Sequence, residues 1–173
     1  MPINSVPERG IDIYIGIGSN LEDPISQVNR ALDELRRLRK TTFSSRSSLY
    51  RSPPMGPADQ PDYINAVARL RTLLPPLKLL DELMKIERTH HRKRTEQHWG
   101  ARTLDLDILI YSDQQIDDTR LTVPHPGLQR RAFVLYPLQE INPDIHIPGQ
   151  GPIGTLIALC PRSDLIKISG EVG

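Results

Sequence analysis

The segment 104–110 is apolar except for two acids, Asp105 and Asp107. In a strand, successive side chains point to opposite faces, so the two carboxylates share one face while Leu104 and Leu106 lie on the other. A strand of this kind belongs in a sheet that is covered on its apolar face and open to polar ligands on the other.

Two carboxylates this close repel each other, and burial makes the ionised pair unfavourable unless a cation lies beside them. A divalent metal ion is the simplest such cation. Mg²⁺ takes oxygen ligands, usually one or two carboxylates, with water and substrate phosphates in the remaining positions. The alternative to a metal site is a strand whose solvent-exposed face happens to carry two acids, and the three residues Asp105 to Asp107 alone do not exclude it.

A segment dense in cations precedes this strand and contains Arg88, Arg92, Lys93, Arg94 and Arg102. Such a run is usually a solvated surface. Beside a carboxylate pair, a run of cations can instead belong to a phosphate-binding site. Phosphoryl transfer uses acids to hold magnesium, and it uses Arg or Lys to neutralise the charge of the phosphate groups. The combined pattern predicts a polyphosphate site.

The composition gives no argument for a nucleic-acid or membrane partner. Lys and Arg number 22 against 21 Asp and Glu, for a net charge of +1, so any attraction for anions must be local. No apolar run approaches the ~20 residues needed to cross a membrane, and the first ten residues lack an apolar signal core. The lone Cys160 fits a reducing compartment. We expect a cytoplasmic protein.

The apolar periodicity predicts the element order βαββαβ. The expected strands cover residues 11–17, 41–50, 63–73 and 104–110, and the expected helices begin at Asp23 and Pro75. This order predicts an α+β fold, a ferredoxin-like sandwich. We expect an additional hairpin at 112–116 and C-terminal helices over 127–138 and 153–160. The length of 173 residues predicts a single domain over 1–173, with residues 1–10 as a loosely ordered extension.

Several side chains suit a flat, polar ring. Tyr63 and Asn65 share a strand face, which places an aromatic plate beside a hydrogen-bonding amide. The proline-rich segment that begins at Ser52 is rigid and can present peptide groups to the edge of a heterocycle. Phe133 is a candidate second plate, although a core position is the commoner role for a phenylalanine. Gly18 and the two residues after it predict a tight turn, because they lack the Lys-Ser/Thr of a phosphate loop.

Five separated motifs stand out along the chain: Gly18-Ser19-Asn20, Ser52-Pro53-Pro54-Met55-Gly56-Pro57, Tyr63-Ile64-Asn65, Trp99-Gly100-Ala101-Arg102-Thr103-Leu104-Asp105-Leu106-Asp107 and Leu121-Thr122-Val123-Pro124-His125-Pro126. In this order they resemble the motifs of the 6-hydroxymethyl-7,8-dihydropterin pyrophosphokinases of folate biosynthesis. The likeness spans Ile11 to Leu159.

The resemblance implies transfer of pyrophosphate from ATP to the hydroxymethyl group of the dihydropterin, with release of AMP. It also implies that the cofactor is Mg²⁺ and that two ions are bound. It implies a monomer whose catalytic residues are Arg92, Arg102, Asp105 and Asp107, the two aspartates being the metal ligands. The pterin-binding positions that it implies are Ser52, Pro53, Met55, Tyr63, Asn65, Trp99 and Phe133. The ATP-binding positions that it implies are Glu87, Arg92, Arg94, Trp99, Arg102, Ile108, Arg120, Thr122, His125 and Arg131.

Two other functions stay open. A ferredoxin-like module could bind single-stranded nucleic acid through the basic segment and Trp99, although the acid pair would repel phosphates unless metal is bound. A nucleotidyltransferase built on Asp-x-Asp would share the metal site but would release pyrophosphate. The nucleotide product separates these functions.

Overall fold

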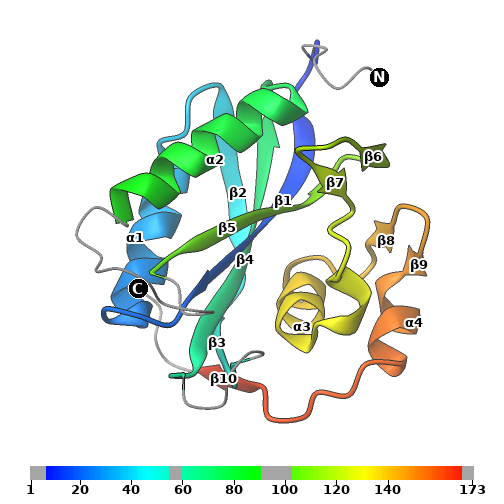
Figure 1. Ribbon diagram of the computed structural model, residues 1–173. Helices are drawn as coiled ribbons and strands as arrows, with labels where there is room; N and C mark the ends of the chain where they lie inside the picture. The colour runs from blue at the N-terminus through cyan, green and yellow to red at the C-terminus, as the bar shows by residue number, and fades with distance from the viewer. Residues whose placement is uncertain (1–6, 55–59, 91–102, 169–173) are drawn as a thin grey trace.

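The computed structural model describes residues 7–54, 60–90 and 103–168. Its strands are β1 (Ile11–Ser19), β2 (Thr41–Arg46), β3 (Leu49–Ser52), β4 (Tyr63–Thr72), β5 (Asp105–Tyr111), β6 (Ile116–Asp117), β7 (Thr122–Val123), β8 (His146–Ile147), β9 (Gly151–Pro152) and β10 (Ile166–Ile168). Its helices are α1 (Pro24–Arg36), α2 (Pro76–His90), α3 (Ala132–Ile141) and α4 (Ile153–Ala158), with a 3₁₀ turn at Leu128–Arg130 (Figure 1).

An antiparallel sheet forms the centre of the structure. Its strands lie in the order β10, β3, β4, β1, β5, and β2 and β3 follow one another along the edge of β4 that β1 leaves free. The expected α+β class is confirmed. The finer description of this sheet as ferredoxin-like stays a prediction.

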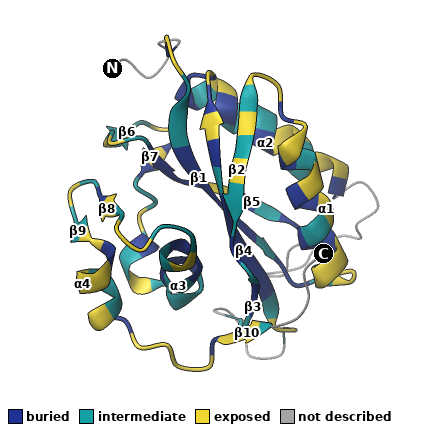
Figure 2. Ribbon diagram, turned by 180° about the vertical axis from the view of Figure 1, so that it is seen from behind, coloured by how far each residue is buried: buried dark blue, intermediate teal, exposed yellow. Residues whose placement is uncertain are grey.

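Helices cover both faces of the sheet, α1 and α2 on one side and α3 on the other (Figure 1). Alternate residues of β1 therefore enter different cores. Ile13, Ile15 and Ile17 pack against α1 and α2, whereas Tyr14 packs against α3. Figure 2 shows the resulting band of buried residues along the middle strands. The side chains of β1 thus hold two helical layers on one sheet.

Helix α1 begins where the sequence predicts. The Asp23 carboxylate caps the first turn by accepting the Ser26 backbone N–H at 3.5 Å, and it also accepts the Ser26 hydroxyl at 2.9 Å. Pro24 occupies that turn, where a missing N–H has no helical partner to lose. None of the helices in the described part of the chain has both the length and the apolar character that crossing a membrane requires.

The single strand expected over residues 41–50 is wrong, because the chain leaves the sheet at Ser47 and Ser48. The Ser47 hydroxyl oxygen accepts the Val67 N–H at 2.9 Å. The Ser48 hydroxyl and N–H donate to the Glu140 carboxylate of α3, at 2.8 Å and 3.1 Å. These side-chain hydrogen bonds replace ladder bonds and divide the segment into β2 and β3.

The continuous helix expected over 127–138 is also wrong. Arg131 has an extended backbone, with φ −114° and ψ 101°, so a 3₁₀ turn ends before it and α3 begins after it. The hairpin expected at 112–116 is wrong, because β6 pairs with β7 in a separate two-stranded sheet and not with β5. β10 has no counterpart among the expected strands, since three residues carry too little periodicity to predict one.

Tyr111 tests how far the core depends on a single buried hydrogen bond. Its side chain is 0% exposed and its hydroxyl donates to the Leu74 carbonyl at 2.6 Å. Burial raises the pKa of Tyr111 to about 12, so the donor persists at neutral pH. Tyr111→Phe leaves that carbonyl unpaired and should lower the free energy of unfolding by about 1–2 kcal/mol, measured by urea denaturation.

Tyr136→Phe is the matched control. The Tyr136 hydroxyl donates to the Cys160 carbonyl at 3.1 Å from a partly buried position, where water can replace the lost donor. A smaller loss is expected for this variant. Equal losses in the two variants would contradict the assigned role of Tyr111.

Candidate active site

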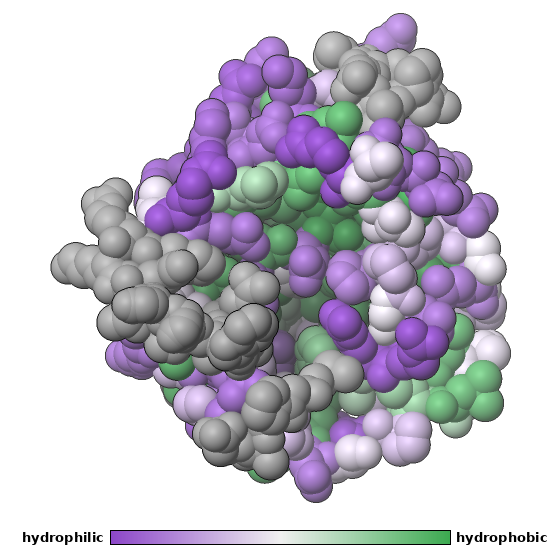
Figure 3. All heavy atoms as spheres, viewed as in Figure 1, coloured by the Kyte–Doolittle hydropathy of each residue, from purple (hydrophilic) through white to green (hydrophobic). Residues whose placement is uncertain are grey.

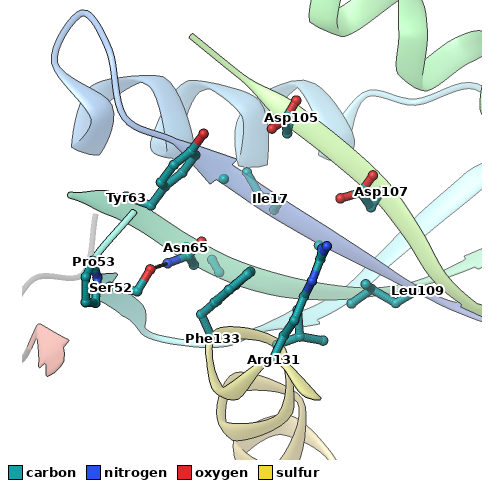
Figure 4. Close-up of a pocket in the computed structure, with 14 residues that line it drawn as sticks. Ile17, Ser52, Pro53, Tyr63, Asn65, Asp105, Asp107, Leu109, Arg131 and Phe133 are labelled. Atoms are coloured by element: carbon teal, nitrogen blue, oxygen red, sulfur yellow. Dashed lines mark hydrogen bonds between the residues drawn. The ribbon is translucent and has the colours of Figure 1, made fainter. Parts of the chain in front are cut away.

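A cavity of about 200 Å³ lies between the middle of the sheet and the start of α3. Five elements of the fold, distant in sequence, contribute to it. Its polar and aromatic lining residues are Ser52, Tyr63, Asn65, Asp105, Asp107, Arg131 and Phe133 (Figure 4). The face of the molecule seen in Figure 3 is hollowed at its centre, with hydrophilic residues around the hollow.

Glycines of β1 form the floor of this cavity. In the antiparallel register Gly18 lies between Asp105 of β5 and Asn65 of β4, and Gly16 lies opposite Asp107. A Cβ at Gly18 would stand 3.4 Å from Asn65 Oδ1 and would fill space above the strand. The prediction that Gly18 belongs to a tight turn is wrong, because Gly18 lies within β1.

The alternation expected for the acid-bearing strand is confirmed. Asp105 and Asp107 both line the cavity, whereas Leu104 and Leu106 pack in the core on the other face. The peptide between the two acids is fixed from the side, since the Leu106 N–H donates to Glu87 Oε2 of α2 at 2.8 Å. Helix α2 therefore holds the strand that presents the carboxylates.

The aspartate pair is the group of cavity residues suited to a metal ion. Among the described residues, no cluster of three or more His, Cys, Asp or Glu side chains comes together. The chain would supply two carboxylates and leave the other positions to water and phosphate oxygens. This donor set fits Mg²⁺.

Asn65 presents a defined hydrogen-bonding edge to the cavity. Its side chain is buried, and Nδ2 donates to the Ser52 hydroxyl oxygen at 2.8 Å. The amide oxygen therefore faces the floor near Gly18 as an acceptor. Tyr63 precedes Asn65 by two residues on the same face of β4, and Pro53 follows Ser52 at the cavity edge (Figure 4).

The opposite wall comes from the start of α3. Figure 4 shows Phe133 and Arg131 directed from α3 toward the sheet, with the guanidinium of Arg131 nearest the acid strand. Arg131 Cζ lies 5.8 Å from the centre of the Phe133 ring, within cation–π range. Gly127 leaves room for this side chain, since a Cβ there would lie 2.8 Å from Arg131 Nε.

His125 is held beside the acid strand by two hydrogen bonds. The backbone N–H of His125 donates to the Leu109 carbonyl at 3.0 Å, and the ring Nδ1 accepts the backbone N–H of Gly127 at 3.2 Å. Burial lowers the pKa of His125; the Asp107 carboxylate opposes that shift and Arg131 adds to it. The neutral ring is thereby favoured, with its hydrogen on Nε2 as a single donor.

Five described residues that were expected at an ATP site lie outside the cavity lining, and His125 is one of them. Ile108 packs in the core on the face of β5 opposite the acids, and Thr122 is exposed on β7. Arg120 pairs with Asp81 at 2.6 Å, an interaction that lowers the pKa of Asp81. Glu87 is the acceptor for the backbone of β5 described above. Their contacts with ATP stay predictions.

Five predicted site residues, Met55, Arg92, Arg94, Trp99 and Arg102, lie outside the described residues. They belong to the segments 55–59 and 91–102. The second of these segments joins α2 to the acid-bearing strand. Their assignment to the pterin and ATP also stays a prediction.

The cavity contains further lining residues that the sequence did not single out. They are Gly16, Ile17, Ala66, Leu109 and Val134. Gly16 and Gly18 repeat at the strand period on the face opposite the isoleucines of β1, and this spacing marks a sheet face without side chains. That signal is present in the sequence. Leu109 carries the same signal, because it follows Asp105 and Asp107 at the strand period and so shares their face.

An α+β fold that places a carboxylate pair, a guanidinium and an amide-aromatic slot in one cavity has the features of a small-molecule transferase. The chain belongs to the 7,8-dihydro-6-hydroxymethylpterin-pyrophosphokinase (HPPK) family, whose model matches residues 14–143. The resemblance seen in its motifs is confirmed.

Curated relatives carry the same enzyme name, 2-amino-4-hydroxy-6-hydroxymethyldihydropteridine pyrophosphokinase. The protein of Pseudomonas aeruginosa is 47% identical over 158 residues, which cover 91% of this chain and 97% of the relative. The protein of Haemophilus influenzae is 46% identical over 159 residues, 92% of this chain and 99% of the relative. The chain is therefore a transferase of the pyrophosphokinase class.

Solved structures of HPPK-DHPS from Plasmodium falciparum share the fold. The wild-type protein with SDX-DHP matches 91% of this chain with a TM-score of 0.69 at 14% identity. The wild-type protein with pterin and p-hydroxybenzoate matches 90% with a TM-score of 0.68, also at 14% identity. This chain spans less than half of those longer chains, 45% and 44% respectively.

The acid pair gives a prediction that does not depend on turnover. Asp107→Asn removes one of two like charges, so without metal its free energy of unfolding should equal or slightly exceed that of the unchanged protein. Mg²⁺ at a hundred times its dissociation constant should stabilise the unchanged protein by about 2.7 kcal/mol. Urea denaturation across a MgCl₂ titration should show little or none of this gain in Asp107→Asn.

Asp144→Asn is the control for this experiment, because Asp144 is exposed and lies outside the cavity lining. It should retain the full magnesium effect. The same magnesium-dependent stabilisation in Asp107→Asn would refute the assignment of the acid pair as the metal site.

Proposed function

We propose that this protein transfers pyrophosphate from ATP to the hydroxymethyl group of 6-hydroxymethyl-7,8-dihydropterin in folate biosynthesis, with Mg²⁺ and with release of AMP. The observation that carries the proposal is that Asp105 and Asp107 share one cavity with Asn65, Phe133 and Arg131. One part of this cavity suits a flat polar ring, and the part beside β5 suits magnesium-bound phosphates. The names of the curated relatives support the same substrate.

The pterin end of the cavity combines an acceptor with flat walls. A pterin carries an amino group and ring N–H groups on one edge, and the oxygen of the Asn65 amide can accept one of these hydrogens. Tyr63 and Phe133 supply aromatic faces from β4 and α3. The glycine floor leaves room for a ring to lie against β1. The hydroxymethyl group would then point toward the acid strand.

The phosphate end is built around the acid strand. Asp105 and Asp107 would hold two magnesium ions, which neutralise charge on the phosphate oxygens. Arg131 adds a fixed positive charge beside them, and the Nε2–H of His125 can donate to a phosphate oxygen. The basic segment 91–102 carries further cations. The electrostatic pattern suits a polyphosphate once metal is bound.

The proposed step needs positioning and charge neutralisation. The hydroxyl oxygen of the pterin attacks the β-phosphorus of ATP, and the bond from that phosphorus to the oxygen bridging the α-phosphate breaks. AMP leaves with the bridging oxygen, and the hydroxyl proton passes to water. No covalent enzyme intermediate forms. Arg92 and Arg102 are predicted to act on the transferred group, where negative charge redistributes during the step.

Binding of single-stranded nucleic acid is the less favoured function, since the described cavity carries two acids and is sized for a small ring. We also propose a ferredoxin-like core, a single domain and a cytoplasmic monomer for this chain. These proposals come from the sequence. The ordering of residues 1–10 likewise stays a prediction.

The nucleotide product distinguishes the possible reactions. Attack at the β-phosphorus must yield AMP, whereas an ordinary kinase yields ADP and a nucleotidyltransferase yields pyrophosphate. Incubation with Mg²⁺, ATP and the reduced pterin alcohol, followed by chromatography of the nucleotides, should give AMP in equal amount to the pyrophosphorylated pterin. ADP as the main product would refute the proposed reaction.

Asn65 tests the pterin end separately. Asn65→Ala removes the buried amide acceptor, so pterin affinity should fall by about tenfold to a hundredfold while ATP affinity is unchanged. Pterin fluorescence measures the first quantity and calorimetry the second. Asn29→Ala on α1 is the control and should match the unchanged protein. A parallel loss of both affinities in Asn65→Ala would argue against a specific pterin contact.

A further inference from the structure

Glu140, near the end of α3, carries a partly buried carboxylate that the proposed reaction does not use. Its side chain is 27% exposed. Oε1 accepts the Tyr50 hydroxyl at 2.7 Å, and Oε2 accepts the Ser48 hydroxyl at 2.8 Å. The Ser48 N–H lies 3.1 Å from both oxygens. Three donors from residues 48–50, where β3 begins, therefore converge on one side chain of α3.

The carboxylate of Glu140 is an ionised acceptor whose partners keep their hydrogens. Burial opposes its charge, but hydrogen bonds from Tyr50 and Ser48 lower the pKa of Glu140 overall, and Lys167 of β10 adds to this effect from 3.9 Å. Burial and the neighbouring carboxylate raise the pKa of Tyr50, so its hydroxyl stays a donor at neutral pH. Hydrogen bonds to an ionised acceptor are about twice as strong as those between neutral groups. Glu140 is therefore a strong, directional contact between α3 and β3.

Both elements that Glu140 joins continue into the candidate active site. Along β3, Ser52 follows Tyr50 by two residues, and its hydroxyl holds the Asn65 amide at the cavity edge. Along α3, Phe133 precedes Glu140 by seven residues, which is two helical turns, so the two side chains lie on the same face of the helix. Figure 4 shows the Phe133 ring directed from that helix toward the sheet. Glu140 thus connects the helix of the aromatic wall with the strand that supports the hydrogen-bonding edge.

Apolar packing alone does not fix the separation of these two walls. Apolar side chains of α3 pack against β1, β4 and β5, and such contacts are non-directional. At the end of α3, Asn142 donates to the Tyr14 hydroxyl oxygen at 2.8 Å and so joins the helix to β1. The polar contact with β3, the strand that carries Ser52, comes from Glu140.

We propose that Glu140 is a positioning residue for pterin recognition, which sets the distance between the aromatic wall on α3 and the hydrogen-bonding edge on β3 and β4. The inference rests on the proposed function. A flat ring needs Phe133 at its face and Asn65 at its edge at the same time, so a small displacement of one wall weakens both contacts.

The phosphate end depends less on Glu140. The strand that carries the two acids is held through α2, where Glu87 accepts the Leu106 N–H. Arg131 precedes α3, but its long side chain can follow a small shift of the helix, whereas a rigid aromatic ring cannot. Loss of the Glu140 contact should therefore lower pterin affinity much more than ATP affinity.

Glu140→Gln tests the proposal, because it keeps the size of the side chain and replaces one acceptor oxygen with an amide group. Pterin affinity, measured by pterin fluorescence without ATP, should fall by about tenfold, whereas ATP affinity measured by calorimetry should stay within about threefold. Tyr50→Phe removes one of the three donors and should give a smaller loss with the same selectivity. Tyr136→Phe is the matched control and should keep full pterin affinity, because its hydroxyl joins α3 to the Cys160 carbonyl and not to the sheet.

A double-mutant cycle separates positioning from a general loss of stability. Phe133→Ala removes the ring that Glu140 places, so adding Glu140→Gln to it should cost little further pterin affinity. Losses that add in full would overturn the positioning role. If Glu140→Gln does not fold, Tyr50→Phe and its double variant with Phe133→Ala decide the question in the same way.

The outcomes distinguish this inference from the proposed function. Unchanged pterin affinity in Glu140→Gln, or an equal loss of pterin and ATP affinity, would overturn the positioning role and leave the proposed reaction standing. Failure of the unchanged protein to bind the pterin would instead refute the proposed function, and the role of Glu140 with it.

Discussion

The antiparallel register across β5, β1 and β4 is the constraint on which the site depends. It sets Asp105, Gly18 and Asn65 in one row across three strands. Backbone hydrogen bonds keep neighbouring strands about 4.8 Å apart, so the acid and the amide are separated by two strand spacings with a glycine between them. A slip of one residue would turn the carboxylates into the core and the leucines into the cavity.

Two carboxylates on one strand face repel each other, so the strand that carries them must be held in place by contacts with the surrounding elements. Helix α2 makes such contacts at both ends of the acid strand. At the N-terminal end of α2, the hydroxyl of Tyr111, the last residue of β5, donates to the carbonyl of Leu74, just before the helix. At the C-terminal end of α2, Glu87 accepts the Leu106 N–H of β5, and His90 joins α2 to α1. The apolar face of β5 and these polar contacts together hold the acids where a cation can reach them.

The extended backbone at Arg131 has a comparable role on the other wall of the cavity. By separating the 3₁₀ turn from α3, it directs a guanidinium toward the acid strand and leaves Phe133 in the first turn of the helix. Helix α3 is in turn fixed to β3 by Glu140, which accepts hydrogen bonds from Ser48 and Tyr50. The aromatic and cationic wall is therefore tied to the sheet that carries its partners.

The sequence by itself determined the features that depend on neighbouring residues. The alternation in β1 and β5, the start of α1 at Asp23 and the shared face of Asp105 and Asp107 follow from strand period and capping chemistry, which act over a few residues. The tertiary structure decided the break between β2 and β3, the extended Arg131 and the partners of His90. The contact from Ser48 to Glu140 spans 92 residues, and the one from His90 to Gln27 spans 63. Such contacts form only when packing brings distant segments together, so no local pattern predicts them.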